Sequence, residues 1–302
     1  MLSNAKGVYI IAQTPFKEND DIDLESVDSL TDFYFSHGAS GLTVLGVSGE
    51  SNKLTFDESV QVANRFIRRA GDKPVIVGVS SPSIAQLTEL TKRVMDDGAK
   101  GVMIAPPTGL HTDQEILNYF EAVFKRIGDT PIVLQDFPFS TRVWMSVPVI
   151  AQLIERHPQI QIIKEEDIPS ITKITKLREL AGRRVAILTG NNAMFLPLEM
   201  GRGIDGPMAG FSHPEMLSTV YKLYTEGKTE EAHKLYNCYL PLLSYENQGQ
   251  WGVAVRKEVM RRRGALKHAG MRSPGPALDA HAHAEIDMLL AHQQQALAAL
   301  GN

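Results

Sequence analysis

The sequence repeats one local pattern eight times: a short run of apolar, often β-branched residues, followed by a segment with helical periodicity. Such runs are typical of parallel strands, because a parallel sheet is covered on both faces and its strands need no polar side. Eight strands that alternate with helices favour a closed (β/α)8 barrel, or TIM barrel, in the α/β class. The runs begin near Val8, Gly41, Pro74, Gly101, Pro131, Ile160, Val185 and Gly203.

Capping residues mark several helices between these runs. The pattern Thr55-Phe-Asp-Glu58 is a capping box that predicts a helix over Glu58–Ala70. The pattern Thr112-Asp-Gln-Glu115 predicts a second helix over Glu115–Ile127 in the same way. Glycines follow both helices, as expected of helix C-termini.

The alternation ends at Ser212, after which every segment is helical. We therefore predict a barrel over residues 1–212 and a C-terminal helical extension over residues 213–302 that packs on it. Lys257 and the run Arg261–Arg263 lie on the third helix of the extension, where a solvated basic face is expected. The four helices are expected at Glu215–Glu226, Thr229–Glu246, Gln250–Ala269 and Ala282–Leu300.

Composition narrows the possible partners. The chain of 302 residues has 31 basic and 35 acidic residues and a net charge of −4, so it is not a polycation built to bind nucleic acid. No apolar run approaches the roughly 18 residues of a membrane span, so no membrane partner is expected. The single cysteine, Cys238, excludes an internal disulfide and favours a cytoplasmic location. His281 and His283 lack further ligand residues nearby, so no metal site is expected.

Lys164 is the most informative residue at a strand end. Barrels of this kind carry their chemistry at the C-terminal ends of the strands, and Lys164 ends the apolar run that begins at Ile160. Burial there favours the neutral amine, which forms Schiff bases with carbonyl compounds. The alternative is a lysine whose amine reaches out to water. We expect that removing Lys164 leaves no buried partner unpaired.

Other strand ends add candidate residues. The turn Gly46-Val-Ser-Gly-Glu50 can bind a carboxylate through the backbone N–H groups of Val47 and Ser48, although it can also be a plain connection. Thr14 and Met208 lie at the ends of the first and last runs. The acidic run Glu165–Asp167 follows Lys164; strand alternation turns Glu165 outward, and the acidic side chains that face the mouth could supply acid/base groups.

In this combination and order, the motifs resemble the dihydrodipicolinate synthase / N-acetylneuraminate lyase family over residues 7–300. The resemblance implies a Schiff base at Lys164 and carboxylate binding by Val47 and Ser48. It implies a small 2-oxo acid substrate, no cofactor because the imine withdraws electrons itself, and a homodimer or homotetramer. It rests on Thr14-Pro15-Phe16, Gly46–Glu50, Ile163–Glu165 and the helical tail.

Departures from the family pattern concern proton transfer and specificity. The family usually has Tyr-Asn-x-Pro-x-Arg after the fifth strand, whereas this chain has Gln135 in place of the tyrosine and Ser140 in place of the arginine. Val47 replaces a threonine, and the tyrosine that a neighbouring subunit supplies falls near Thr108-Gly109. The three hydroxyls of the family's proton relay are therefore missing. Glutamine can hydrogen-bond but is no general acid at neutral pH.

The segments Gln135–Pro138 and Leu240–Asn247 resemble the 2-keto-3-deoxy-L-arabonate dehydratase branch. We therefore predict a Schiff-base lyase in which Lys164 attacks a 2-oxo acid, such as a 2-keto-3-deoxy sugar acid, and Gln135 orients substrate or water. Thr14 and Met208 are assigned to substrate binding. One alternative is an authentic synthase that condenses pyruvate with aspartate semialdehyde, against which Ser140 argues. Another is a barrel that binds a 2-oxo acid without turnover.

Overall fold

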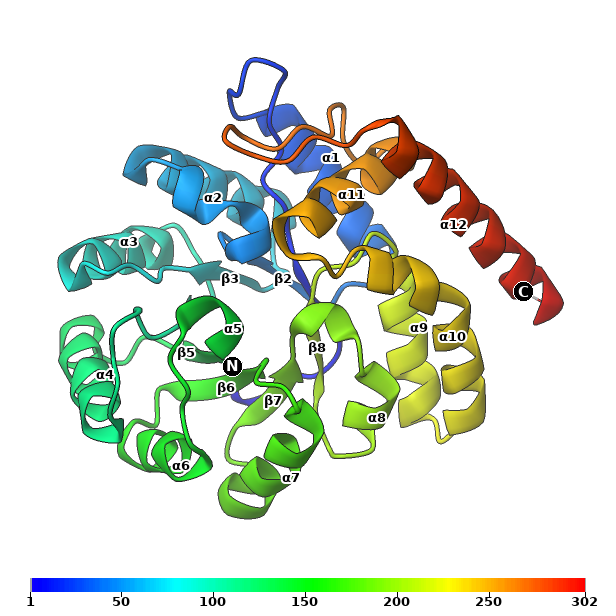
Figure 1. Ribbon diagram of the computed structural model, residues 1–302. Coiled ribbons are helices and arrows are strands. Elements are labelled where there is room, and N and C mark those ends of the chain that lie inside the picture. Colours follow the sequence, from blue (N-terminus) through cyan, green and yellow to red (C-terminus); the bar gives the residue numbers. More distant parts are fainter. Residues whose placement is uncertain (1, 302) are drawn as a thin grey trace.

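The computed structural model describes residues 2–301 and contains a closed barrel of eight parallel strands in chain order (Figure 1). This confirms the predicted (β/α)8 fold. All the strands are almost entirely buried, which explains why their sequences are continuously apolar. The strands are β1 Tyr9–Ile11, β2 Gly41–Val44, β3 Val75–Gly78, β4 Gly101–Ile104, β5 Ile132–Asp136, β6 Ile160–Glu165, β7 Ala186–Thr189 and β8 Gly206–Ala209.

Helices surround the strands, and the two predicted capping boxes are present. The Thr55 side chain accepts a hydrogen bond from the backbone of Glu58, and the Glu58 side chain accepts one from the backbone of Thr55. Thr112 and Glu115 form the same pair of bonds. The helices up to the last strand are α1 Leu24–Ser36, α2 Phe56–Ala70, α3 Ile84–Asp96, α4 Asp113–Ile127, α5 Pro138–Thr141, α6 Val147–Arg156, α7 Ser170–Ala181 and α8 Leu196–Met200.

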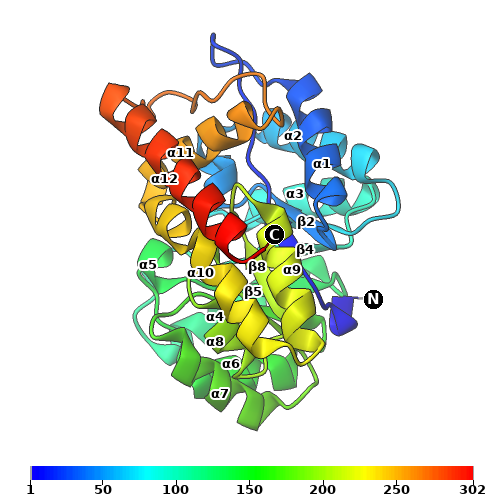
Figure 2. The ribbon, with the colours of Figure 1, turned by 90° about the vertical axis from the view of Figure 1, so that its right-hand side faces the viewer.

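Four helices follow β8: α9 Pro214–Thr225, α10 Thr229–Tyr245, α11 Gly249–Arg262 and α12 Ala280–Ala299. Helix α9 contacts α8, and Ser218 Oγ donates to the carbonyl oxygen of His37 after α1, so α9 completes the ring of helices around the strands. Helix α12 packs against α10 on the outside of the molecule (Figures 1 and 2). A unit boundary at residue 212 remains a prediction about independent folding.

The third of these helices is shorter than predicted. It was expected to extend to Ala269 but ends at Arg262. Gly264 has φ +79°, a left-handed conformation that ends helices, and Ala265 N donates to Met260 O across the terminus. The chain then runs without helix to Ala280, past the predicted break at Ser273–Pro276.

The apolar side chains of the strands point into two separate cores. An outer core lies between strands and helices, and a smaller inner core fills the barrel. Leu2 and Ala5 belong to the inner core, which also includes Met208. Its strand residues are Tyr9, Ile11, Ile76, Met103, Val133, Ile162, Ala186, Leu188 and Met208.

Two features are absent from residues 2–301: a helix suited to cross a membrane and a cluster of metal-ligand side chains. No helix in this range is both long and apolar enough to cross a bilayer. No group of three or more His, Cys, Asp or Glu side chains in this range is placed to hold a metal ion.

Candidate active site

Lys164 lies in the barrel mouth, near the end of β6. It comes two residues after Ile162 of the inner core, so strand alternation turns its side chain inward. Its Nζ atom lies 2.6 Å from Oε1 of Glu166, and the two side chains are 6% and 5% exposed. A nearly buried amine with a carboxylate as its partner therefore lies where the sequence predicts the nucleophile.

Gln135 joins the same cluster from β5. It is opposite Lys164 in the strand register, and its Nε2 atom donates to Glu166 Oε1 at 2.9 Å. One carboxylate oxygen thus binds both residues that the sequence assigns to catalysis. The side chain of Glu166 lies over Gly190 at the end of β7, where an added Cβ would be 2.2 Å from Glu166 Cγ. Glycine at position 190 is what lets this carboxylate lie in the mouth.

Glu166 also corrects one expectation. Removing Lys164 was expected to leave no buried partner unpaired, but it would leave the buried Glu166 carboxylate with only the Gln135 donor. The sequence contained a signal for this contact. Residues 164 and 166 are two apart, and side chains two apart at a strand end share a face.

The turn after β2 lies across the barrel from Lys164, because β2 and β6 are four strands apart in a ring of eight. Residues Val47–Gly49 form a short 3-10 helix. The N–H groups of Val47 and Ser48 begin this helix, and none of the hydrogen bonds within residues 2–301 uses them. Thr14 Oγ1 donates to the Gly49 carbonyl at 2.6 Å, so Thr14 holds the turn from β1. The turn offers two backbone donors to an anion.

A buried ion pair anchors this turn. Lys257 Nζ lies 2.5 Å from Glu50 Oε1, and both side chains are fully buried. Burial lowers the pKa of Lys257, and the Glu50 carboxylate opposes this shift. The prediction that Lys257 belongs to a solvated face is therefore wrong. The arginines are also paired: Arg261 and Arg262 with Glu258, and Arg263 with Glu215, at 2.7–2.8 Å.

The outward faces of β5 and β6 carry a separate acidic cluster. Asp136 and Glu165 are opposite in the register and fully buried, as alternation predicts for the residues after Gln135 and Lys164. Lys173 of α7 is paired with Asp136 and lies 2.9 Å from Asp167. Glu165 thus faces away from the mouth.

Burial dominates the titration of this cluster. It raises the pKa of Asp136 to about 6, although the Lys173 ammonium works in the opposite direction. Burial also raises the pKa of Glu165 well above its usual value, and the Asp136 carboxylate adds to this shift. Burial disfavours the ammonium form of Lys173, but Asp136 and Glu165 outweigh this effect and raise its pKa.

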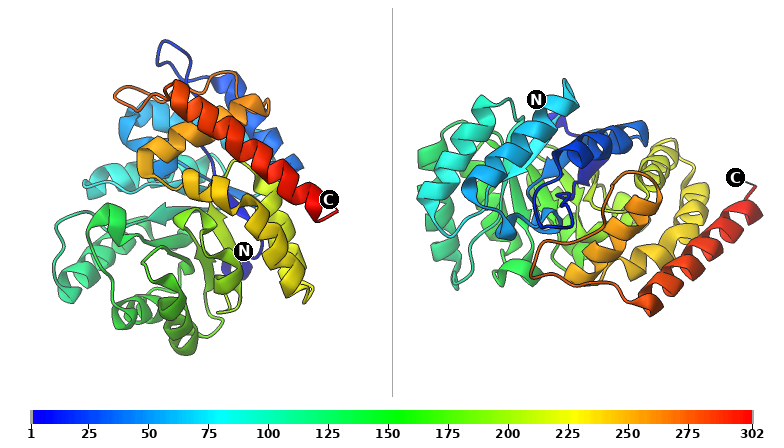
Figure 3. Two further views of the ribbon diagram at one scale, coloured as in Figure 1. Left: turned by 45° about the vertical axis from the view of Figure 1, so that its right-hand side comes forward. Right: turned by 90° about the horizontal axis from the view of Figure 1, so that it is seen from above.

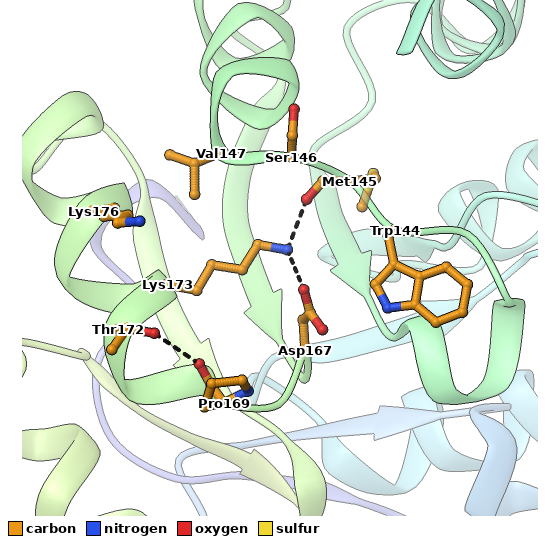
Figure 4. Close-up of a pocket in the computed structure, with 9 residues that line it drawn as sticks. All are labelled: Trp144, Met145, Ser146, Val147, Asp167, Pro169, Thr172, Lys173 and Lys176. Carbon is orange, nitrogen blue, oxygen red and sulfur yellow. Dashed lines mark hydrogen bonds and ion pairs between the residues drawn. The ribbon is translucent and has the colours of Figure 1, made fainter. Parts of the chain in front are cut away.

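A cavity of about 340 Å³ adjoins the acidic cluster outside the barrel (Figure 4). Lys173 reaches across it to Asp167 and to the Met145 carbonyl, and Trp144 borders the other side. Lys164 is not among the lining residues, so this cavity is not the barrel mouth.

No hydrogen bond or ion pair within the described chain joins Met208, Ser140 or Arg142 to the Lys164 cluster. Met208 is fully buried in the inner core. Ser140 is exposed, and the guanidinium of Arg142 lies 5.5 Å from the ring centroid of the exposed Phe139. Arg142 thus stacks on the surface and makes no hydrogen bond to Gln135, Lys164 or Glu166 within the described chain.

Comparison with known proteins agrees with the fold and with the family resemblance of the motifs. Residues 4–293 match the model of the dihydrodipicolinate synthetase family. The chain is 28% identical over 287 residues to the L-2-keto-3-deoxyarabonate dehydratase of Azospirillum brasilense, which covers 93% of this chain and 92% of that protein. It is 30% identical over 241 residues to the 4-hydroxy-tetrahydrodipicolinate synthase of Persephonella marina, which covers 78% and 81%.

A solved structure shows the same architecture along nearly the whole chain. The dihydrodipicolinate synthase of Rhodopseudomonas palustris superimposes with a TM-score of 0.94 at 44% sequence identity. The superposition covers 97% of this chain and 99% of that one.

Proposed function

The chain belongs to the dihydrodipicolinate synthetase family, and we propose that it is a Schiff-base lyase that removes water from a 2-keto-3-deoxy sugar acid. One observation carries the proposal: a single oxygen of Glu166 lies 2.6 Å from Lys164 Nζ and 2.9 Å from Gln135 Nε2. A carboxylate at this point can supply the acid/base function that the family's missing tyrosine would provide.

The first steps make the substrate electron-poor. Glu166 takes a proton from the Lys164 ammonium, and the free amine attacks C2 of the 2-oxo acid. Glu166 then gives that proton to the oxygen of the adduct, which leaves as water, and a protonated imine remains. The N–H groups of Val47 and Ser48, with the Ser48 hydroxyl, hold the C1 carboxylate across the mouth. The positive imine nitrogen then draws electrons from C3, so no metal or cofactor is required.

Elimination follows at C3 and C4. The Glu166 carboxylate removes a proton from C3, and the electron pair of that C–H bond forms the C2=C3 double bond of an enamine while the C=N electrons return to nitrogen. The enamine electrons then expel the hydroxyl from C4. The protonated Glu166 gives its proton to the leaving oxygen, which departs as water. Hydrolysis of the imine releases the product and restores Lys164. Gln135 keeps the carboxyl group of Glu166 in place throughout.

Two measurements test the proposal. Borohydride reduction in the presence of a 2-oxo acid should attach one substrate carbon skeleton to Lys164, as read by mass spectrometry, and the adduct should be absent in Lys164→Ala. A panel of 2-keto-3-deoxy sugar acids should then show water loss with at least one member. An adduct on another lysine contradicts the assignment of the nucleophile. An adduct without turnover of any panel member favours a binding protein.

A second candidate is a 4-hydroxy-tetrahydrodipicolinate synthase, favoured by the names of the relatives from Persephonella marina and Rhodopseudomonas palustris. The exposed Ser140 argues against it, because serine lacks the two-pronged guanidinium that grips the carboxylate of an aldehyde partner. Steady-state kinetics with pyruvate and aspartate semialdehyde separate the two. We expect catalytic efficiency about one to two decades below that of an authentic synthase, because a charge-assisted two-pronged contact to the aldehyde partner is lost.

The cellular location and the oligomeric state of the enzyme belong to the same proposal. We expect a cytoplasmic homodimer or homotetramer, on the resemblance to the family. Light scattering of the purified full chain tests the assembly.

A further inference from the structure

Four buried polar atoms on one side of the barrel mouth lack a hydrogen-bond partner within residues 2–301. They are Nε2 and Oε1 of Gln13, Oγ1 of Thr43 and Nη1 of Arg256. Gln13 and Thr43 are fully buried and Arg256 is 1% exposed. Because buried polar groups in native proteins normally have partners, four such atoms together indicate a place where something polar binds.

The strand register places Thr43 and Gln13 next to each other. Ile11 of the inner core is opposite Thr43 in the pairing of β1 with β2. Thr43 faces the lumen, because it lies two residues after Gly41, whose open face is covered by the ring of Tyr9. Gln13 lies two residues after Ile11, and so faces the lumen one layer nearer the mouth.

Arg256 reaches the same place from α11. Gly210 lies between two outer-core residues, Ala209 and Phe211, so its missing side chain would point into the lumen. An added Cβ there would be 2.5 Å from Arg256 Nη1 and 3.4 Å from the Ile11 carbonyl oxygen. The guanidinium therefore fills the space above Gly210, beside β1.

The Arg256 guanidinium is held by an ion pair, but not all of its N–H groups have an acceptor. Its Nε atom donates to Glu246 Oε2 at 2.9 Å, and both side chains are buried. The next residue, Lys257, fixes α11 through Glu50. Figure 3 shows α11 as an orange helix on the side of the blue helix α1, whose Tyr34 contacts Met260 of α11. The Nη1 atom of Arg256 is therefore a donor that is fixed in position and has no acceptor within residues 2–301.

We propose that Gln13, Thr43 and Arg256 form a subsite for the hydroxyl-bearing chain of a 2-oxo acid, on the β8–β1–β2 side of the mouth. The inference rests on the proposed function, since it takes Lys164 as the residue that holds C2. An amide, a hydroxyl and a guanidinium together offer donors and acceptors, which suits alcohol oxygens. The methyl group of pyruvate would leave all four atoms unpartnered, so the subsite selects hydroxylated acids over pyruvate.

Two near-isosteric variants test the subsite without touching the buried ion pairs. Gln13→Met and Thr43→Val remove the polar atoms and keep the volume. Thr31→Val is the matched control, because Thr31 is also fully buried but its hydroxyl is bonded to the Val27 carbonyl of its own helix at 2.7 Å. The readouts are binding of a 2-keto-3-deoxy sugar acid by calorimetry and borohydride trapping with pyruvate.

We expect Gln13→Met and Thr43→Val each to weaken binding of the sugar acid about ten-fold, the scale of one neutral hydrogen bond. Trapping with pyruvate should stay within about two-fold of wild type, as should both readouts in Thr31→Val. Sugar-acid binding that matches the control overturns the subsite, as does an equal loss in both readouts. Wild-type binding that depends on Gln13 but leads to no turnover contradicts the proposed reaction and leaves the subsite standing.

Discussion

The ammonium group of Lys257 lies 2.5 Å from a carboxylate oxygen of Glu50, although the two residues are 207 positions apart in the chain. Glu50 also accepts hydrogen bonds from Lys53 Nζ at 2.8 Å and from the backbone of Arg272 at 3.1 Å. The turn whose N–H groups we propose to bind the substrate carboxylate is thus held by residues of the C-terminal extension. Contacts from residues 257 and 272 of the extension reach a strand end of the barrel.

Replacing Lys257 by methionine should lower the free energy of unfolding by about 3 kcal/mol, because it leaves a buried carboxylate short of a partner. Lys53 remains beside Glu50, which keeps the loss at the lower end of the usual range. Denaturation by urea measures it. Lys267→Met is the matched control, since Lys267 pairs with Glu25 at the surface and should change stability by less than about 1 kcal/mol. Equal losses in both variants would show that the buried ion pair contributes no more to stability than the surface pair.

Glu166→Gln should lower kcat by about 10²- to 10⁴-fold, because the amide cannot accept the C3 proton. The borohydride adduct on Lys164 should still form, but more slowly, because the amine remains while Glu166 no longer takes its proton. Single-turnover kinetics and mass spectrometry separate the two steps. Glu165→Gln serves as the control, because Glu165 faces outward and should leave kcat within about ten-fold of wild type. A Glu166→Gln enzyme with normal kcat would remove this residue from the mechanism.

The raised pKa of Asp136 predicts that the free energy of unfolding depends on pH. Burial raises its folded pKa from 3.8 to about 6, so between these values the folded protein holds a proton that the unfolded chain has lost. Stability contributed by this group is therefore complete below about pH 4 and is lost as the pH rises to about 6. Relative to Asp136→Asn, wild type should lose about 2–3 kcal/mol across this window. Urea denaturation at several pH values measures the difference, and a constant difference would contradict the assignment.

A chain that ends at Ser212 should aggregate or fail to fold. Helix α9 completes the ring around the strands, and its buried residues Met216, Leu217 and Val220 cover apolar surface that would otherwise meet water. The truncation also removes Lys257 from Glu50. Size-exclusion chromatography and circular dichroism of the expressed fragment check this. A monodisperse, folded fragment would show that residues 1–212 are a self-sufficient domain.

Local patterns in the sequence were enough to predict the strands, the direction of the β6 side chains and the helix caps. Eight apolar runs predict eight parallel strands, because period and length in the chain translate directly into strands and helices. Alternation along β6 is enough to turn Lys164 inward and Glu165 outward. The capping box at Thr55 depends on residues three apart, and it is present as predicted.

Contacts between distant segments could only be decided by the tertiary structure. The sequence offers Glu166 as one of three neighbouring acids, and the glycine at position 190, directly after the next strand, is what gives it room in the mouth. Lys257 belongs to a basic stretch that predicts a solvated face, yet packing of α11 buries it against Glu50. Burial and pairing of a charge depend on which surfaces meet after folding, and short-range periodicity carries no information about partners some 200 residues away.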